Sequence, residues 1–281
     1  MAMTMKPNPS ARRAGPAVVF RGLALAAGLA ALVPAPTAAQ HETRTILAVF
    51  AHADDERIVG PLLSRYAAAG HEVLLVIATD GRKGVRDFAG IPAGDSLAAI
   101  RAEEARCAAE RLGIRPPILL GLEDAGLASF TALGRLRTEL RRIFAEYAPD
   151  VVITFGPEGG TGHPDHRLVG VVTTEVFQAG GEGWPRALYF PSLPSERMKD
   201  APAARTTIGT VPAALLPVRV PFGPAELEAT RRAFACHATQ YSPEEQAGVM
   251  RYLEHGWNGT VYLRPFGGSA APRSDILAGE P

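Results

Sequence analysis

The sequence has no excess of charge of either sign, only two cysteines, and no apolar run long enough to cross a membrane comfortably. Its 281 residues include 29 basic and 29 acidic side chains, so the formal net charge is zero. A nucleic-acid-binding protein usually carries a basic stripe on its surface, and a nucleic-acid partner is therefore not expected. The shares of hydrophobic residues (47%) and charged residues (21%) are those of an ordinary globular protein with a substantial core.

A glycine-rich phosphate-binding turn is also missing. The apolar run over residues 45–50 predicts a buried first strand, and residues 51–56 after it contain no glycine. A dinucleotide-binding protein of the Rossmann type needs a Gly-x-Gly-x-x-Gly turn at this place. The absence of this turn argues against a plain nucleotide binder.

The two cysteines, Cys107 and Cys236, leave two interpretations open. An exported chain can join two cysteines in a disulfide. Both residues fall in apparent helices, however, and the sequence alone does not place them within bonding distance. Two buried thiols are therefore an equal alternative. Neither cysteine has the position of a lipid-anchoring residue after a signal peptide.

The first 39 residues differ from the rest of the chain. Basic residues without any acidic ones precede an apolar run over residues 22–33, and small residues then lead to Ala39. The basic residues are Lys6, Arg12, Arg13 and Arg21. This pattern predicts a secretory signal peptide over residues 1–39, with an uncleaved anchor as the alternative. We therefore expect an exported protein, periplasmic or extracellular, without stable membrane insertion after cleavage.

Cleavage of that peptide would change the charge of the chain. It would remove four of the 29 basic residues and none of the 29 acidic ones, which leaves 25 against 29 and a net charge of −4. A net negative charge favours solubility and disfavours tight binding to anionic membranes.

Predicted strands and helices alternate through the first two thirds of the mature chain. The strands are expected at residues 45–50, 71–78, 117–122, 150–155 and 186–190, and the helices at 57–69, 95–113, 131–147 and 166–177. Such alternation predicts an α/β fold, a Rossmann-like, mainly parallel sheet with helices on both faces. Further along, residues 206–221 have an interrupted strand pattern, residues 224–238 a helical one, and residues 262–266 suggest a small edge strand.

Two polar clusters follow predicted strands at the points where those strands end. Residues 51–56 (Ala-His-Ala-Asp-Asp-Glu) follow the first strand, and residues 162–166 (Gly-His-Pro-Asp-His) come a few residues after the fourth. In an open parallel sheet, ligands bind outside the carboxyl ends of the strands. The two clusters are therefore predicted to form one site together.

Three residues of these clusters, His52, Asp55 and His166, are of the kinds that bind zinc. A catalytic zinc site uses three protein ligands and leaves a fourth position for water. His52 and Asp55 are three residues apart, so one turn of backbone can aim both at one point. The two histidines disfavour magnesium and calcium, whereas other divalent transition metals such as iron or cobalt also fit.

The neighbouring residues are candidate catalytic groups. Asp54 can accept a proton from the attacking water. His163 can polarise the substrate carbonyl or protonate the leaving nitrogen, and Asp165 can fix the tautomer of His163. Each cluster alone has a simpler explanation, because paired aspartates open helices and Pro-Asp is common in turns. Two such clusters at matched strand ends favour a metal site.

These motifs resemble those of the PIG-L (LmbE-like) family of zinc-dependent N-acetylglucosaminyl deacetylases. The family's Ala-His-Pro-Asp-Asp-Glu motif is matched by residues 51–56, and its His-Pro-Asp-His motif by residues 163–166. Weaker matches are Arg101-x-x-Glu104 in a helix ending at Leu112-Gly113, Asp124-x-Gly126, and residues 235–240 (Ala-Cys-His-Ala-Thr-Gln). The resemblance spans roughly residues 45–266, so we expect one deacetylase domain over residues 40–266. The tail over residues 267–281 is rich in glycine, alanine, proline and serine, and this composition predicts disorder.

The resemblance implies a role for each residue of the two main motifs. These roles are zinc ligand for His52, Asp55 and His166, base for Asp54, and oxyanion stabiliser or acid for His163. The resemblance decides between the two aspartates, because spacing alone does not say which one shares the metal with His52. It also implies that Arg101 and Asp124 contact substrate hydroxyls; without it, they are a charge on a helix surface and a turn former.

The sequence departs from the family pattern in two places. Ala53 replaces the usual proline, which loosens that turn without removing a ligand. Residues 79–84 (Thr-Asp-Gly-Arg-Lys-Gly) lack the usual Gly-Glu, which leaves the substrate-facing loop and hence the substrate undetermined. The role of His237 is also open, because it can line the cleft or be a structural histidine near a helix end.

We therefore predict a zinc-dependent hydrolase that removes an acetyl group from an N-acetylated sugar or sugar-like substrate, a small molecule or glycoconjugate of the N-acetylglucosamine type. An amidase that cuts a larger amide or a thiol conjugate is one alternative. A non-catalytic sugar-binding relative is another, but it would lack a base or a ligand, and none is missing here. The sequence does not determine the oligomeric state.

Overall fold

The computed structural model describes residue 15 and residues 42–181, 183–202, 208–267 and 271–278. The predicted signal peptide over residues 1–39 therefore lies outside the described residues, apart from Gly15. Among the helices that are described, none combines the length and the apolar character needed to span a bilayer.

A seven-stranded sheet forms the centre of the part of the chain that follows residue 41. Its strands lie in the order β3-β2-β1-β4-β5-β9-β8, and the first five of these are parallel. Their bounds are β1 (Thr45–Phe50), β2 (Glu72–Thr79), β3 (Ile118–Leu122), β4 (Val151–Thr154), β5 (Ala187–Pro191), β8 (Val218–Pro221) and β9 (Thr260–Pro265). The predicted α/β class and the mainly parallel sheet are confirmed.

The prediction that residues 262–266 form an edge strand is wrong. β9 pairs antiparallel with both β5 and β8, so it lies inside the sheet. β8 takes the edge, and its residues alternate between buried and exposed. That alternation is typical of a strand with one face covered by the protein and the other in contact with water.

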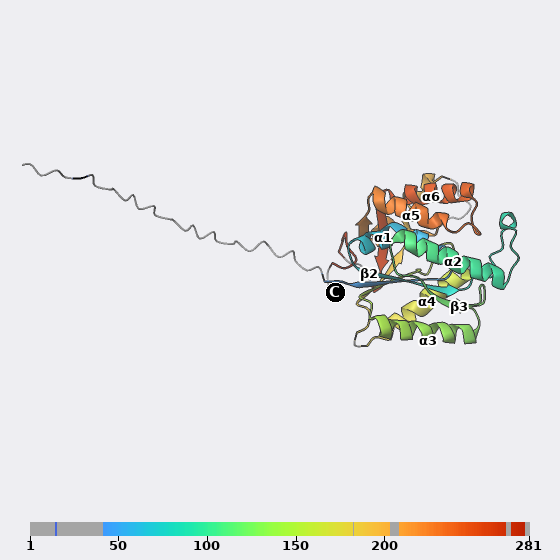
Figure 1. The fold of residues 1–281 in the computed structure, drawn as a ribbon. Helices are drawn as coiled ribbons and strands as arrows, with labels where there is room; N and C mark the ends of the chain where they lie inside the picture. The colour runs from blue at the N-terminus through green and yellow to red at the C-terminus, as the bar shows by residue number, and fades with distance from the viewer. Residues whose placement is uncertain (1–14, 16–41, 182, 203–207, 268–270, 279–281) are drawn as a thin grey trace, which may run out of the picture. The chain divides into compact units, whose positions relative to one another are not determined.

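Helices cover both faces of the sheet, as predicted. Figure 1 shows α1, α2, α5 and α6 on one face and α3 and α4 on the other. The bounds are α1 (Gly60–Ala68), α2 (Asp95–Leu112), α3 (Phe130–Tyr147), α4 (Pro164–Gln178), α5 (Pro224–Ala235) and α6 (Pro243–Trp257). Short 3-10 helices at Asp55–Ile58 (η1) and Asp87–Ala89 (η2) precede α1 and α2, and η3 (Met198–Asp200), η4 (Ala213–Leu215) and a small ladder of β6 (Leu193–Pro194) and β7 (Thr210–Val211) follow β5.

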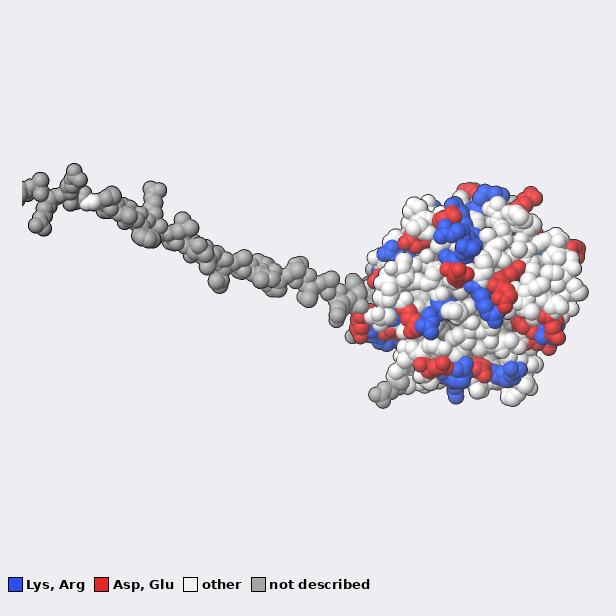
Figure 2. Space-filling view, viewed as in Figure 1, with Lys and Arg blue, Asp and Glu red and all other residues white. Residues whose placement is uncertain are grey.

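The central strands form the core because both of their faces are covered. From Ile46 to Phe50, every residue of β1 is fully buried, and so are most residues of β2 and β4. Parallel strands buried on both faces read as continuous apolar runs rather than alternating ones, which explains why these strands were predictable. On the face shown in Figure 2, acidic and basic side chains are interspersed, as along α3, where Arg142 pairs with Glu139 and Glu146.

Capping residues set several helix boundaries. α2 ends at Leu112 because Gly113 adopts a left-handed conformation, close to the predicted end. α4 begins two residues earlier than predicted, because Pro164 occupies its first turn and the His163 side chain caps it. α6 was not predicted, although Ser242 and Glu245 form a capping box at its start.

Residues 271–278, which lie in the segment predicted to be disordered, pack against the core. Ile276 is 2% exposed and packs into the core, and its N–H donates to the Tyr66 hydroxyl at 2.9 Å. The same hydroxyl donates to Asp275 at 2.6 Å, and Arg273 bridges to Val218 of the edge strand. One apolar residue and two polar contacts anchor a segment whose composition alone suggested no structure.

Candidate functional site

The two polar clusters meet where the order of the sheet reverses. β1 pairs with β4 in parallel, so the carboxyl ends of both strands lie at the same edge, which is the usual ligand position in such sheets. A cleft of about 220 Å³ opens there. Its lining comes from loops after β1, β2, β3 and β4, from α2 and α4, and from the segment after α5. The lining residues are His52, Asp54, Asp55, Arg57, Gly84, Arg101, Asp124, Thr161, His163, His166, Gln240 and Tyr241.

His52, Asp55 and His166 bring ligand atoms together in this cleft. His52 Nδ1 lies 3.0 Å from His166 Nε2, which lies 3.2 Å from Asp55 Oδ1. Asp55 Oδ2 lies 3.6 Å from His52 Nδ1. A tetrahedral centre with bonds of about 2.0–2.2 Å separates its ligand atoms by about 3.4 Å, so the three side chains are spaced as ligands of one ion.

The orientation of His166 leaves its Nε2 as the free ligand atom. Its Nδ1 lies 2.9 Å from the carbonyl of Gly159, which can only accept a hydrogen bond, so Nδ1 carries the proton and donates. Its ring stacks on Phe155 with centroids 4.2 Å apart. Burial, joined by repulsion from His52, lowers the pKa of His166 despite the attraction of Asp55. The ring is therefore neutral with a lone pair on Nε2, the form that binds a metal.

His52 is oriented by carboxylates on its far side. Its Nε2 lies 3.2 Å from Asp124 Oδ1 and 3.6 Å from Asp165 Oδ2, whereas its Nδ1 faces Asp55. Burial opposes protonation of His52, but the contacts with Asp124, Asp165 and Asp55 outweigh it and raise the pKa well above its usual value. Burial opposes ionisation of Asp55, but attraction to His166 and the contact with His52 lower its pKa. Carboxylates on both sides of His52 make the binding of a positive charge at this site electrostatically favourable.

Two other sets of ligand-type atoms lie within 4.8 Å of one another among the described residues. They are His52 with His163 and His166, and His52 with Asp124 and Asp165. In the first set, His163 Nδ1 already accepts a hydrogen bond from the Asp165 N–H at 3.1 Å. In the second set, both carboxylates face His52 Nε2, the nitrogen that points away from His166. Asp55 is the carboxylate that faces both histidines at once.

The Asp54 carboxylate lies between two arginines. Its Oδ1 lies 3.5 Å from Arg101 Nη2, and its Oδ2 lies 3.3 Å from Arg57 Nη1. Asp54 is 7% exposed and lines the cleft. Two guanidinium groups therefore hold its carboxylate at the cleft wall beside the ligand cluster.

The predicted contact between the side chains of Asp165 and His163 is wrong. The Asp165 carboxylate accepts a hydrogen bond from the Ala125 N–H at 2.8 Å and faces His52. His163 is instead oriented by the Asp165 backbone N–H, because His163 is the residue that caps α4. This bond occupies Nδ1, so Nε2 is the nitrogen of His163 that carries a proton in the neutral ring.

Arg101 and Asp124, the expected substrate residues, both line the cleft and also have structural partners. Arg101 donates to the carbonyls of Ala53 at 2.7 Å and Gly81 at 3.1 Å. Gly81 has φ +64°, and a Cβ on it would lie 2.3 Å from Arg101 Nη1, so only glycine permits this approach. Contacts with His52 and attraction to Arg101 lower the pKa of Asp124 to about 2, against the opposing effect of burial.

Several residues of the site were not identified from the sequence. Arg57 is 3% exposed and its guanidinium lies 5.6 Å from the ring centroid of Phe234 and 5.4 Å from that of Tyr241. The undecided His237 is fully buried, with Nε2 2.6 Å from Glu56 Oε1. The sequence shows Glu56 and Arg57 beside the first cluster, but not the distant residues that contact them.

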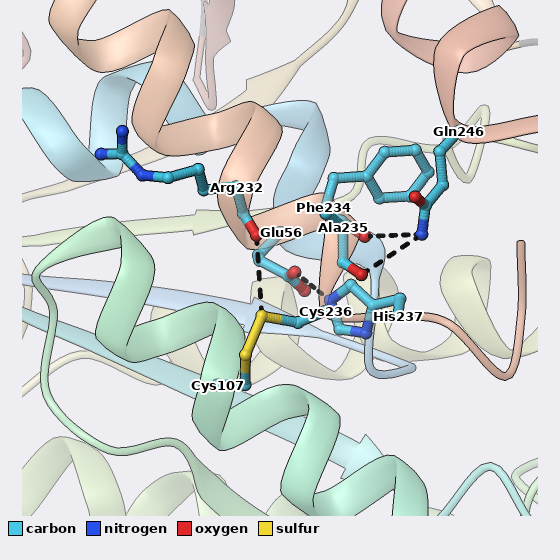
Figure 3. Close-up of a disulfide and its surroundings, with 8 residues drawn as sticks. All are labelled: Glu56, Cys107, Arg232, Phe234, Ala235, Cys236, His237 and Gln246. Carbon is cyan, nitrogen blue, oxygen red and sulfur yellow. Dashed lines mark hydrogen bonds and ion pairs between the residues drawn. A yellow bond between two sulfur atoms is a disulfide. The ribbon is translucent and has the colours of Figure 1, made fainter. Parts of the chain in front are cut away.

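The cysteine question is answered by the fold. Cys107 of α2 and Cys236, which follows α5, form a disulfide with Cα atoms 5.9 Å apart (Figure 3). Residues 129 positions apart meet because α2 and α5 lie on the same face of the sheet (Figure 1).

Fold and site together define an α/β protein with clustered imidazole and carboxylate groups beside a buried acid, at the carboxyl ends of parallel strands. The model of the PIG-L family, described as GlcNAc-PI de-N-acetylase, matches residues 47–177. A 1D-myo-inositol 2-acetamido-2-deoxy-alpha-D-glucopyranoside deacetylase from Mycolicibacterium smegmatis is 31% identical over 285 positions, covering 85% of this chain and 98% of the relative. The chain belongs to the PIG-L deacetylase family, and it is an enzyme that hydrolyses a non-peptide amide bond.

Solved structures support the fold. The N,N'-diacetylchitobiose deacetylase from Pyrococcus horikoshii has a TM-score of 0.61 at 20% identity, covering 84% of this chain and 89% of its own. A 4-carboxy-2-hydroxymuconate hydratase from Pseudomonas putida has a TM-score of 0.60 at 16% identity, covering 83% of this chain and all of its own. Because one fold carries both a deacetylase and a hydratase, the site and not the fold must decide the reaction.

Proposed function

We propose that this protein is a zinc-dependent deacetylase that releases acetate from an N-acetylated sugar of the N-acetylglucosamine type. The observation that carries the proposal is the convergence of His52 Nδ1, His166 Nε2 and the Asp55 carboxylate within 3.0–3.6 Å of one another beside Asp54. The curated relatives named as deacetylases of an acetamido-sugar joined to inositol support the substrate class.

The donor set fits zinc. Two imidazole nitrogens and one carboxylate are the ligands of catalytic zinc sites, and such sites keep a position for water. His52, Asp55 and His166 would hold the ion, with Asp124 and Asp165 orienting His52 from behind. A bound zinc ion supplies Lewis-acid chemistry, which polarises the amide carbonyl and makes water more acidic. Iron or cobalt would suit the same donors.

The residues around this centre would move the protons. Asp54 accepts the proton of the attacking water, since its carboxylate is held at the wall of the cleft by Arg57 and Arg101. His163 donates from Nε2, either to the developing oxyanion or to the leaving nitrogen, because its Nδ1 is occupied by the Asp165 N–H. Acetate and a free amine are the products.

The polar wall formed by Arg101 and Asp124 would bind sugar hydroxyls. Asp124 is ionised at neutral pH and therefore accepts hydrogen bonds from a polyol. Hydroxyls of the substrate would form hydrogen bonds with Arg101, Asp124 and Gln240, which line the cleft.

Acetate release from a panel of N-acetylated sugars and inositol glycosides tests this function. The mature protein is first stripped with a chelator and then reloaded with zinc, iron or cobalt. We expect acetate from at least one N-acetylglucosamine derivative, only with metal. Release of a larger acid from a longer amide, without acetate from any sugar, would instead support an amidase for larger amides.

We further propose that the protein is exported after cleavage near Gln40. The basic and apolar segment before residue 40 supports this, and so does the Cys107–Cys236 disulfide, because disulfides persist mainly in oxidising compartments. Sequencing the N-terminus of the protein from the extracytoplasmic fraction is the test. An N-terminus at Met1 in that fraction would contradict cleavage.

A further inference from the structure

The backbone at Asp54 is held in an unfavourable conformation. Asp54 has φ +104°, a region that non-glycine residues rarely adopt. Residues kept in such conformations need surrounding contacts that enforce them. The Asp54 N–H donates to Glu56 Oε2 at 3.0 Å, its carbonyl accepts a hydrogen bond from the Arg57 guanidinium, and the preceding carbonyl of Ala53 accepts one from Arg101.

The Glu56 carboxylate is itself held by a distant histidine. Its other oxygen, Oε1, lies 2.6 Å from His237 Nε2, and Figure 3 shows the two side chains meeting between η1 and the end of α5. Glu56 is 1% exposed and His237 is fully buried. His237 Nδ1 has no hydrogen-bond partner among the described residues, so Glu56 is the contact that orients the ring.

The segment that carries His237 is linked to α2 by a disulfide and by hydrogen bonds. Cys236 is bonded to Cys107, and the Glu104 carboxylate accepts hydrogen bonds at 2.7 Å from both the N–H and the hydroxyl of Thr239. Glu104 and Cys107 are three residues apart and therefore lie on one face of α2. Arg101, three residues earlier on that face, contacts the Asp54 loop directly.

We propose that Glu56 and His237 are positioning residues that hold Asp54 in its left-handed conformation and so aim its carboxylate into the cleft. This inference rests on the proposed function of Asp54 as the base. The disulfide and the Glu104–Thr239 contact set where His237 stands, and Glu56 transmits that position to the backbone of Asp54. Neither Glu56 nor His237 is among the residues that line the cleft.

A stabilising role and a positioning role can be separated by removing both partners. Breaking a buried ion pair by removing one partner is costly, whereas replacing both by apolar groups of similar shape is often neutral for stability. The double variant Glu56→Leu with His237→Leu should therefore fold, while the Asp54 N–H loses its acceptor. A purely structural pair predicts full activity for this variant.

The double variant is expected to lose turnover without losing substrate or metal binding. We expect kcat to fall about 10- to 100-fold, the scale of a misplaced catalytic group, with KM and bound metal within about twofold of the unchanged protein. A crystal structure of the variant should show Asp54 with a negative φ. The single conservative variant His237→Gln, which keeps an N–H for Glu56, should have a kcat within about threefold of that of the unchanged protein.

A matched control separates these effects from simple loss of stability. Tyr66→Phe removes a buried hydroxyl that contacts Asp275 and Ile276, and none of these three residues lines the cleft. It should lower the melting temperature with kcat unchanged. If the double variant fails to fold, Glu56→Gln takes its place. The contacts with the Asp54 N–H and with His237 use different carboxylate oxygens, and glutamine replaces one of these acceptors by an NH2 donor.

Each result decides the proposal. Unchanged kcat together with an unchanged φ at Asp54 in the double variant overturns the proposal. It is also overturned if Tyr66→Phe lowers kcat as much as the double variant does, because the fall would then follow from lost stability. If the unchanged protein releases no acetate from any substrate, the proposed function fails. In that case the φ of Asp54 in the variant crystal structure still decides whether Glu56 and His237 hold this backbone.

Discussion

Single residues in this site have distinct tasks although several are of the same type. Four aspartates lie in or beside the cleft, and they face three different sets of partners. Asp55 faces both candidate metal-binding nitrogens, Asp124 and Asp165 face the opposite nitrogen of His52, and Asp54 faces two arginines. Direction, more than residue type, separates a candidate ligand from a candidate base.

The neighbouring aspartates provide a test at this scale. Asp55→Asn should weaken metal binding, because a neutral amide is a poor zinc ligand. Asp54→Asn should keep its metal and slow turnover by about two to four powers of ten, the range of general acid–base catalysis. Asparagine tolerates positive φ, so the Asp54 backbone should survive the change. Bound metal is measured by elemental analysis and turnover by acetate release.

The reverse result would exchange the two roles. Metal lost from Asp54→Asn and kept by Asp55→Asn would make Asp54 the ligand. Full activity in both variants would exclude the proposed mechanism.

At the scale of helices and strands, a disulfide and a group of ion pairs link elements that are far apart in the chain. The Cys107–Cys236 disulfide closes a separation of 129 residues between α2 and the end of α5. Replacing both cysteines by serine should lower the free energy of unfolding by about 2–4 kcal/mol, chiefly through the unfolded state. Urea denaturation with and without a thiol reductant is the measurement. Reductant should destabilise the unchanged protein alone, and equal stability of the two proteins under oxidising conditions would contradict the prediction.

Asp150 joins the starts of three parallel strands. Its carboxylate accepts a hydrogen bond from the Thr45 N–H at 2.9 Å and pairs with Arg44 and Arg186. Burial alone would raise the pKa of Asp150, but the Thr45, Arg186 and Arg44 contacts outweigh it and lower the pKa. Because the folded pKa is depressed, the stabilisation is present above the ordinary pKa of about 3.9 and is lost as the pH falls through the folded value.

Asp150→Asn should therefore destabilise the protein at neutral pH and matter less in acid. The difference in free energy of unfolding between the two proteins should shrink below about pH 4. Urea denaturation at several pH values, with metal removed from both proteins by a chelator, measures this difference. A difference that stays constant down to about pH 2 would contradict the assignment.

At the scale of the whole molecule, the last described segment completes the core. Ile276 is 2% exposed. Its N–H donates to the Tyr66 hydroxyl, and its carbonyl accepts a hydrogen bond from the Tyr189 hydroxyl. Ile276→Ala should lower the free energy of unfolding by about 2–5 kcal/mol, the cost of truncating a large aliphatic core residue. The control Ser274→Ala, at an exposed position, should change it by less than about 0.5 kcal/mol. Equal stability of both variants would show that the segment adds nothing to the core.

The sequence by itself determined the parts of this protein that depend on local pattern. Continuous apolar runs identify β1, β2 and β4 because strands buried on both faces have no polar side to show. The placement of polar clusters after β1 and β4 identifies the site, because parallel strands bring their carboxyl ends to one edge of the sheet. Residue type and spacing then nominate His52, His166 and one of the two aspartates, and the resemblance to the PIG-L family selects Asp55 over Asp54.

Only the tertiary structure decided which distant residues meet. The pairing of Cys107 with Cys236 depends on two helices packing on one face of the sheet, and the place of β9 inside the sheet depends on β8 adding to its outer side. The Glu56–His237 contact joins residues 181 positions apart. Ile276 is buried through contacts with distant residues, which the composition of its own segment does not reveal. Local pattern sets which faces are apolar, but the direction of a side chain and the identity of its partner follow from how the packed elements are arranged.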